Sequence, residues 1–288
     1  MRDFDFLEPS TVVEACRMLA DLGDECRAMA GGTALMLAMR QRMLSPTHIV
    51  SLARIDALRG IDFDPVHGLR IGALSRHCDV AGSALVLHHY PMLASMAARL
   101  ANPQVRNQGT IGGNLCYADP ATDPPGCLMA LDARVVLAGP QGERVLSMQE
   151  FLVDYYQTAL QPDELLREIR IPPPLPGSTG HYARFLRTAA EHRPLVNLAL
   201  ALRRDAGRGH AVRLVTGAST AIPTRATRAE QFLEGRVVTP LVAAEAAAMV
   251  AADIDALSDQ RGSADYRRAM VRVTAQRSIH ALFGLAQE

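Results

Sequence analysis

The chain has 288 residues, 49% of them hydrophobic, and its 30 basic residues balance 30 acidic ones. This length and composition are typical of a globular protein with a large core, in one or two domains. The zero net charge gives no support for a nucleic acid or an anionic membrane surface as a partner. Every basic residue is Arg and none is Lys, so any fixed positive charge must come from a guanidinium group.

The cysteines and the chain start indicate a reduced, cytoplasmic protein. Five cysteines without paired spacing argue for free thiols, and no Cys-x-x-Cys motif could hold an iron–sulfur cluster. No histidine pair has helical zinc spacing, so we expect no metal site. Asp3 and Asp5 argue against a secretion signal, and the apolar residues 241–252 are too few for membrane insertion.

The first part of the chain predicts a β–loop–α–β unit. Ser10-Thr11 with Glu14 is a capping signal for a helix that ends at Gly23. The following elements are a strand over 26–30, a helix over 33–43 and a strand over 48–52. Gly31-Gly32 lies between the first strand and its helix, where free N–H groups favour a phosphate.

The middle part predicts mostly strands. The expected elements are a strand over 69–74, a helix over 85–101, a hairpin of 134–138 with 144–146, a helix from Ser147 to about Ala159 and a strand over 164–171.

Four prolines and a glycine within 172–177 then predict a domain boundary. We expect one domain over 1–171, with subdomains over about 1–57 and 58–171, and a second over 178–288. For the second domain, the sequence predicts antiparallel strands over 182–187, 196–204 and 212–218, followed by helices at roughly 226–234, 239–252 and 263–284.

The most informative segment runs from Ala101 to Asp123. It holds Gly109, Gly112 and Gly113 close together, and glycine lets backbone N–H groups approach a ligand closely. A run of such groups forms an anion site. With the upstream Gly31-Gly32 turn, this predicts one ligand with two phosphates held from both sides. Neither a Gly-x-Gly-x-x-Gly motif after a strand nor a phosphate-loop Gly-Lys-Ser/Thr is present.

Arg106 to Asn114 matches the pattern Arg-Asn-x-Gly-Thr-Ile-Gly-Gly-Asn at every specified position. With Ala30 to Leu35, this segment resembles the flavin-binding subunit of the molybdenum hydroxylases. That family includes the medium chain of carbon monoxide dehydrogenase and the FAD domain of xanthine dehydrogenase. The resemblance covers essentially the whole chain, although Ala34 stands where the family usually carries Ser.

The resemblance implies a fold and an assembly. The fold is α+β: a two-subdomain FAD-binding module of the vanillyl-alcohol-oxidase/PCMH type, then a small α+β domain with a three-stranded antiparallel sheet and helices. The implied partners are a large molybdopterin-binding subunit and a small subunit with two [2Fe–2S] clusters, in a dimer of heterotrimers. Electrons from the clusters would reach an external acceptor by way of FAD in this chain.

The resemblance also implies the cofactor-binding residues, with no catalytic side chain and no metal ligand. Asp123 precedes Pro124-Pro125 and is also expected as a helix N-cap, and Arg187 occupies a position where the family often has Lys near the flavin. The implied set is Met29, Ala30, Gly31, Gly32, Thr33, Ala34, Leu35, Ala101, Gly109, Thr110, Gly113, Asn114, Asp123 and Arg187.

Two other functions stay open at this point. A stand-alone flavoenzyme of the same FAD module, like vanillyl-alcohol oxidase, would bring its own substrate domain, for which residues 178–288 are small. A non-catalytic assembly protein that holds a nucleotide would lack a yellow chromophore. Copurification with partner subunits would separate the family function from both alternatives.

Overall fold

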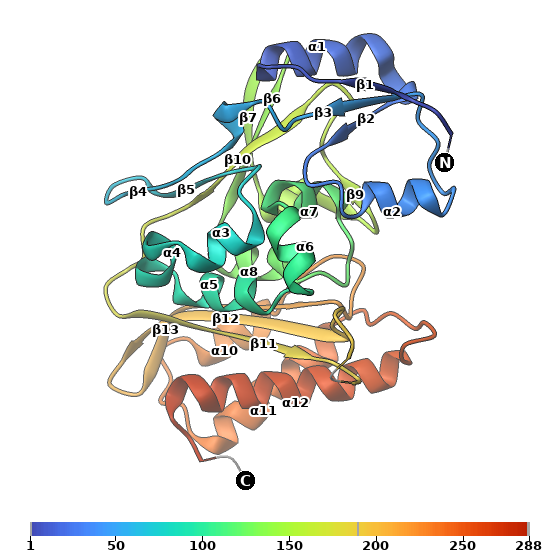
Figure 1. Ribbon diagram of the computed structural model, residues 1–288. Coiled ribbons are helices and arrows are strands. Elements are labelled where there is room, and N and C mark those ends of the chain that lie inside the picture. Colours follow the sequence, from blue (N-terminus) through green and yellow to red (C-terminus); the bar gives the residue numbers. More distant parts are fainter. Residues whose placement is uncertain (1, 189, 287–288) are drawn as a thin grey trace.

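The protein is described by a computed structural model, which covers residues 2–188 and 190–286. Figure 1 shows its layers from one end to the other. A small sheet with one covering helix lies at the N-terminal end, followed by a larger sheet, a layer of short helices, a third sheet and a final layer of helices. The expected mixed α and β fold is confirmed.

The N-terminal sheet is parallel, with strand order β1-β3-β2. Helix α1 follows β1, and its N-cap is the predicted Thr11, whose side chain accepts a hydrogen bond from Glu14 N. Helix α2 is shorter than the predicted 33–43, because Arg42 has a positive φ of 59° that ends the helical conformation. The elements are β1 (Asp5–Leu7), α1 (Val12–Leu22), β2 (Cys26–Met29), α2 (Leu35–Arg40) and β3 (His48–Ser51).

The second sheet has five antiparallel strands in the order β4-β5-β10-β6-β7. The predicted hairpin is present, with Gly139 paired to Gly142 across its turn. The strands are β4 (Ile61–Asp64), β5 (Gly68–Gly72), β6 (Arg134–Gly139), β7 (Gly142–Ser147) and β10 (Leu165–Ile171). Their buried side chains, including Ile71, Val135 and Ile169, share one hydrophobic core with the helices beside the sheet.

The helix predicted over 85–101 is two helices. Tyr90 separates them with φ −137° and ψ 59°, because the residue before a proline is disfavoured in the helical region. Of the four further short helices in this layer, only the one after Asp123 had a sequence signal, since six or seven residues carry little periodic signal. The helices are α3 (His77–Gly82), α4 (Ala84–His89), α5 (Pro91–Arg99), α6 (Pro103–Gln108), α7 (Ile111–Tyr117) and α8 (Pro124–Ala130).

The helix predicted from Ser147 to about Ala159 is wrong beyond its first turn. The capping box of Ser147 with Glu150 forms, but α9 (Met148–Phe151) ends after four residues. The chain then becomes extended in β8 (Leu152–Asp154) and β9 (Gln157–Thr158). Phe151, the last residue of α9, and Leu152, the first of β8, are both buried in the core.

The C-terminal part contains the three predicted strands plus β14, a two-residue edge strand, in the order β11-β12-β13-β14. Along β12, Ala199 faces the core of the FAD-binding part, whereas Leu198 and Leu200 face the C-terminal helices. The sheet is thus buried on both faces. The elements are β11 (Ser178–Phe185), β12 (Val196–Asp205), β13 (Arg208–Gly217), β14 (Thr224–Arg225), α10 (Thr227–Leu233), α11 (Pro240–Asp253) and α12 (Ala264–Phe283).

None of the helices in residues 2–188 and 190–286 combines the length and apolar character needed to cross a bilayer. All five cysteines are free thiols.

Candidate cofactor site

The first glycine loop carries a run of unused backbone donors. It connects the carboxyl end of β2 to α2, and Gly32 turns the chain with φ +72°. Within the described part of the chain, the N–H groups from Gly31 to Leu35 donate to no protein acceptor. Since α2 has only six residues, its dipole is small, and these N–H groups are what the loop offers an anion.

The second glycine loop, between α6 and α7, uses its donors within the protein. Gly109 N donates to Val105 O at 2.7 Å, and Gly112 N donates to Ala73 O at 2.9 Å. Gly113 N donates to the hydroxyl of Thr110 at 3.2 Å. The prediction that both loops present free N–H groups is therefore wrong for the second loop, whose available groups are mainly side chains.

The two loops lie in direct contact. A Cβ atom on Gly31 would overlap the carbonyl oxygen of Gln108 and lie 2.9 Å from the Cα of Gly109. A Cβ on Gly113 would lie 3.4 Å from the Cβ of Ala30. The fold therefore brings together the two segments that the sequence singled out, and Gly31 permits this close approach of two backbones.

Thr110 and Asn114 lie on the first turn of α7. Thr110 is its N-cap and is 6% exposed. The amide of Asn114 is half-buried, and its Nδ2 donates to the hydroxyl of Thr122 at 2.8 Å. The cap bond to Gly113 N and the bond to Thr122 therefore hold the two side chains in place.

Arg106 and Ala101 close the turn that precedes the second loop. Ala101 has a positive φ of 43°. One Arg106 Nη1 donates to Leu100 O at 2.8 Å and to Ala101 O at 3.1 Å. The arginine that carries much of the sequence motif therefore holds the backbone in shape.

Asp123 does not cap α8 with its side chain, which corrects the expectation from the sequence. It is 2% exposed and accepts a hydrogen bond from the hydroxyl of Tyr182, and its Oδ1 lies 3.6 Å from Nε of Arg184. Burial raises the pKa of this carboxyl, while the Arg184 charge and the Tyr182 hydrogen bond act in the opposite direction. The carboxyl thus joins α8 to β11 of the C-terminal part.

Arg187 lies in the C-terminal part, just after the end of β11. Its Nε donates to Glu191 at 2.8 Å, and its Nη1 donates to Arg261 O at 3.3 Å. These partners belong to the C-terminal part, and within the described residues Arg187 makes no hydrogen bond or ion pair to the glycine loops. The structure therefore does not join Arg187 to the other predicted site residues.

His77 is a residue that sequence reasoning missed. Its backbone N–H donates to Gly109 O at 3.2 Å, and both its ring and the Thr33 hydroxyl lie close to Gly109. Burial, helped by the positive charge of Arg106, lowers the pKa of His77 to about 4, so the ring is neutral at pH 7. An isolated histidine gives no spacing signal, and no pattern in the sequence marks it.

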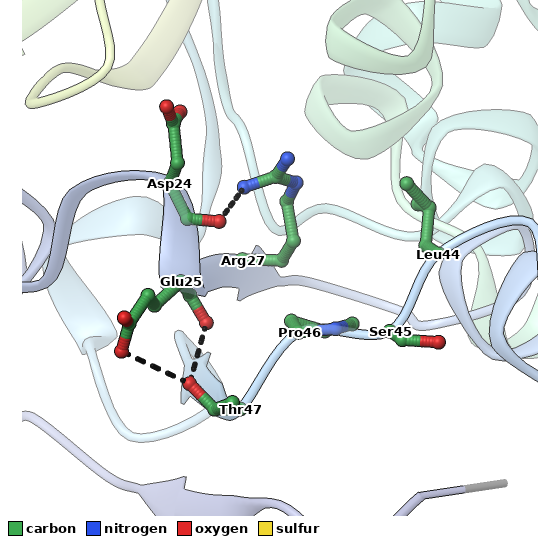
Figure 2. Close-up of a pocket in the computed structure, with 7 residues that line it drawn as sticks. All are labelled: Asp24, Glu25, Arg27, Leu44, Ser45, Pro46 and Thr47. Carbon is green, nitrogen blue, oxygen red and sulfur yellow. Dashed lines mark hydrogen bonds between the residues drawn. The ribbon is translucent and has the colours of Figure 1, made fainter.

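Figure 2 shows the residues that line a separate cavity at the amino ends of β2 and β3. The cavity has a volume of about 270 Å³ and is lined by Asp24 and Glu25, which precede β2, by Arg27 of β2, and by residues 44–47 before β3. Ligands of open α/β sheets bind beyond the carboxyl ends of the strands, which is where the glycine loop lies. This cavity is therefore distinct from the candidate site.

The residues present fit FAD. A dinucleotide needs donors for two phosphates, and the first loop offers a run of free N–H groups. Thr110 and Asn114 add a hydroxyl and an amide at the start of α7, whose Gly113 lies close to Ala30 of the first loop. No group of three or more His, Cys, Asp or Glu side chains suited to a metal occurs among the described residues.

Comparison with known proteins agrees with this fit. The family described as the FAD binding domain in molybdopterin dehydrogenase matches residues 2–174, and the CO dehydrogenase flavoprotein C-terminal domain matches residues 181–282. The chain is 33% identical to the 6-hydroxypseudooxynicotine dehydrogenase complex subunit alpha of Paenarthrobacter nicotinovorans, over 96% of this chain and 93% of that protein.

The chain is also 32% identical to the carbon monoxide dehydrogenase medium chain of Hydrogenophaga pseudoflava, over 96% of each. A solved structure of that organism's carbon monoxide dehydrogenase, lacking the Mo-pyranopterin moiety of its cofactor, matches with a TM-score of 0.94 at 32% identity and covers 99% of both chains. The resemblance seen in the sequence is confirmed. The chain belongs to the family of FAD-binding subunits of the molybdenum hydroxylases.

Proposed function

We propose that the two contacting glycine loops of this chain bind FAD, with the first loop as the main phosphate site. The observation that carries the proposal is the run of free N–H groups from Gly31 to Leu35 against the second loop. The residues proposed to surround the cofactor are Met29, Ala30, Gly31, Gly32, Thr33, Ala34, Leu35, Ala101, Gly109, Thr110, Gly113 and Asn114. Asp123 and Arg187 remain predictions as residues near the flavin ring.

Within the complex, this subunit works in electron transfer. FAD, when bound, supplies redox chemistry that connects the [2Fe–2S] clusters of a small partner subunit to an external acceptor. The chain itself binds and orients the cofactor. A large molybdopterin-binding partner would carry the substrate site, and we propose a dimer of heterotrimers as the assembly.

The proposed division into domains places the boundary within 172–177, with an FAD-binding domain over 1–171 and a C-terminal domain over 178–288. An apolar cluster around the C-terminal helices, formed only by residues beyond the boundary, supports it, although the main cluster of the FAD-binding part also takes in Tyr182, Ala199 and Val215. A cytoplasmic location is likewise proposed, supported by the five free cysteines.

Reconstitution with FAD tests the cofactor proposal. The purified chain, refolded with excess FAD, should become yellow with near-equal stoichiometry, and acid precipitation should release the flavin from the protein. A chain that stays colourless would contradict FAD binding.

Copurification and reduction assays test the subunit role. The isolated chain should accept electrons from dithionite but should not oxidise purines, aldehydes or N-heterocycles. With both partners present, substrate should bleach the flavin absorbance. Substrate-driven bleaching by the isolated chain would instead indicate a stand-alone flavoenzyme.

A further inference from the structure

A short segment behind the second glycine loop is held by the C-terminal part of the protein. We call residues 118–123, between α7 and α8, the linking segment. Arg193 pairs with Asp119 at 2.6 Å, and Ala218 N donates to Pro120 O at 3.1 Å. Nδ2 of Asn197, on β12, donates to Thr122 O at 2.7 Å. The bonds between Asp123 and β11 add to these contacts, so β11, β12, Arg193 before β12 and Ala218 after β13 hold the segment at several points.

The linking segment also contacts the candidate site. The hydroxyl of Thr122 lies 2.8 Å from Nδ2 of Asn114 and 3.1 Å from its Oδ1. The hydroxyl therefore holds the Asn114 amide in place, and the amide keeps hydrogen-bonding capacity for another partner. A continuous chain of hydrogen bonds thus runs from β12 through Thr122 to Asn114.

We propose that Thr122 and Asn197 are positioning residues that orient the Asn114 amide toward FAD, so that the C-terminal domain sets the affinity of the flavin site. This inference rests on the proposed function, in which Asn114 contacts the cofactor. The hydroxyl of Thr122 bonds Asn114, and Asn197 bonds the carbonyl of Thr122, so both residues act through Asn114.

The surroundings of Asn197 support a specific role. The side chain is 1% exposed, and its Oδ1 has no hydrogen-bond partner among the described residues. Burying a half-satisfied amide is unfavourable compared with an apolar side chain of similar size. A Cβ on Gly217 would lie 2.6 Å from that Oδ1, so the glycine leaves room for the amide. The hydrogen bond from Asn197 to Thr122 O offsets this unfavourable burial.

The test uses the full chain, freed of flavin and titrated with FAD while flavin fluorescence is followed. Thr122→Val keeps the side-chain shape but removes the hydroxyl, and it should raise the dissociation constant for FAD by about 10-fold, the equivalent of one hydrogen bond. Thr122→Ser should restore the affinity to within about 2-fold. Thr224→Val is the matched control, because its hydroxyl bonds Ile222 O in the C-terminal part.

A double-mutant cycle separates positioning from general destabilisation. Asn114→Ala should weaken FAD binding, and adding Thr122→Val to it should cause no further loss, because the amide that Thr122 orients is gone. Asn197→Ala should weaken FAD binding in the wild-type background and much less in the Asn114→Ala background.

Wild-type affinity in Thr122→Val, or losses that simply add in the double mutant, would overturn the inference. A wild-type chain that binds no FAD would overturn the proposed function itself, so the two failures are distinguishable.

Discussion

The two glycine loops use the same residue type for different physical purposes. In the first loop, Gly31 lets another backbone come close, and the donors that follow it stay free. In the second loop, Gly112 lies against Ala73, to which its N–H is bonded. The first loop therefore offers backbone donors to a ligand. The second loop uses its backbone donors within the protein and presents the side chains of Thr110 and Asn114. A glycine-rich motif alone does not distinguish these two uses.

Replacing Gly31 should have the largest effect on this arrangement. The side chain of Gly31→Val would overlap Gln108 O and push the loops apart. We expect at least a ~100-fold loss of FAD affinity and roughly 2–3 kcal/mol of destabilisation. Gly82→Ala is the control, because a Cβ there meets nothing within 4 Å. FAD titration and urea unfolding measure both effects, and normal FAD binding by Gly31→Val would show that the loops do not act together.

Gly113→Val should separate binding from folding. Its Cβ would lie 2.9 Å from the Thr110 hydroxyl, which can rotate away, and 3.4 Å from Ala30. The affinity for FAD should fall by ~10- to 100-fold, while the free energy of unfolding should fall by only about 1 kcal/mol. Fluorescence titration and circular dichroism provide the two measurements. A variant with wild-type FAD affinity would exclude the second loop from the site.

Thr110→Val tests the side-chain contribution of the second loop. Loss of the N-cap bond should cost about 1 kcal/mol of stability, and loss of the hydroxyl should weaken FAD binding by ~10-fold. The matched control is Thr239→Val, which removes the N-cap of α11 in the C-terminal part. The control should lose similar stability without any change in FAD affinity. Equal effects of both variants on FAD would mean that Thr110 acts only through folding.

Mild acid should lower the free energy of unfolding, because His77 is buried beside the second loop. The pKa of His77 is lowered from 6.5 to about 4, so between these values the unfolded chain binds the proton more readily than the folded one. The contribution of neutral His77 to the free energy of unfolding is thus complete above pH 6.5 and declines as the pH falls toward 4. At pH 6 the loss should be roughly 1 kcal/mol.

Urea unfolding at pH 7.5 and 6 measures this loss. His77→Leu should show a correspondingly smaller difference between the two pH values. An equal difference in both proteins would assign the pH dependence to other groups.

Local sequence signals determined much of the fold. The Thr11 cap, the hairpin around residues 139–142 and the long helix α12 follow from capping, turn chemistry and period, which act between neighbours along the chain. These local signals fail where contacts with residues distant in the sequence decide the conformation. The capping box at Ser147 begins a helix, yet the chain becomes extended after one turn, with Phe151 and Leu152 buried in the core.

For the site, the sequence by itself determined that two glycine segments exist and that their pattern is that of a flavin subunit. The tertiary structure decided which N–H groups remain free, because that depends on whether a distant carbonyl such as Ala73 O accepts them. It also paired Asp123 with Tyr182 and brought His77 beside Gly109. These contacts join residues far apart in the chain, and no local propensity encodes them.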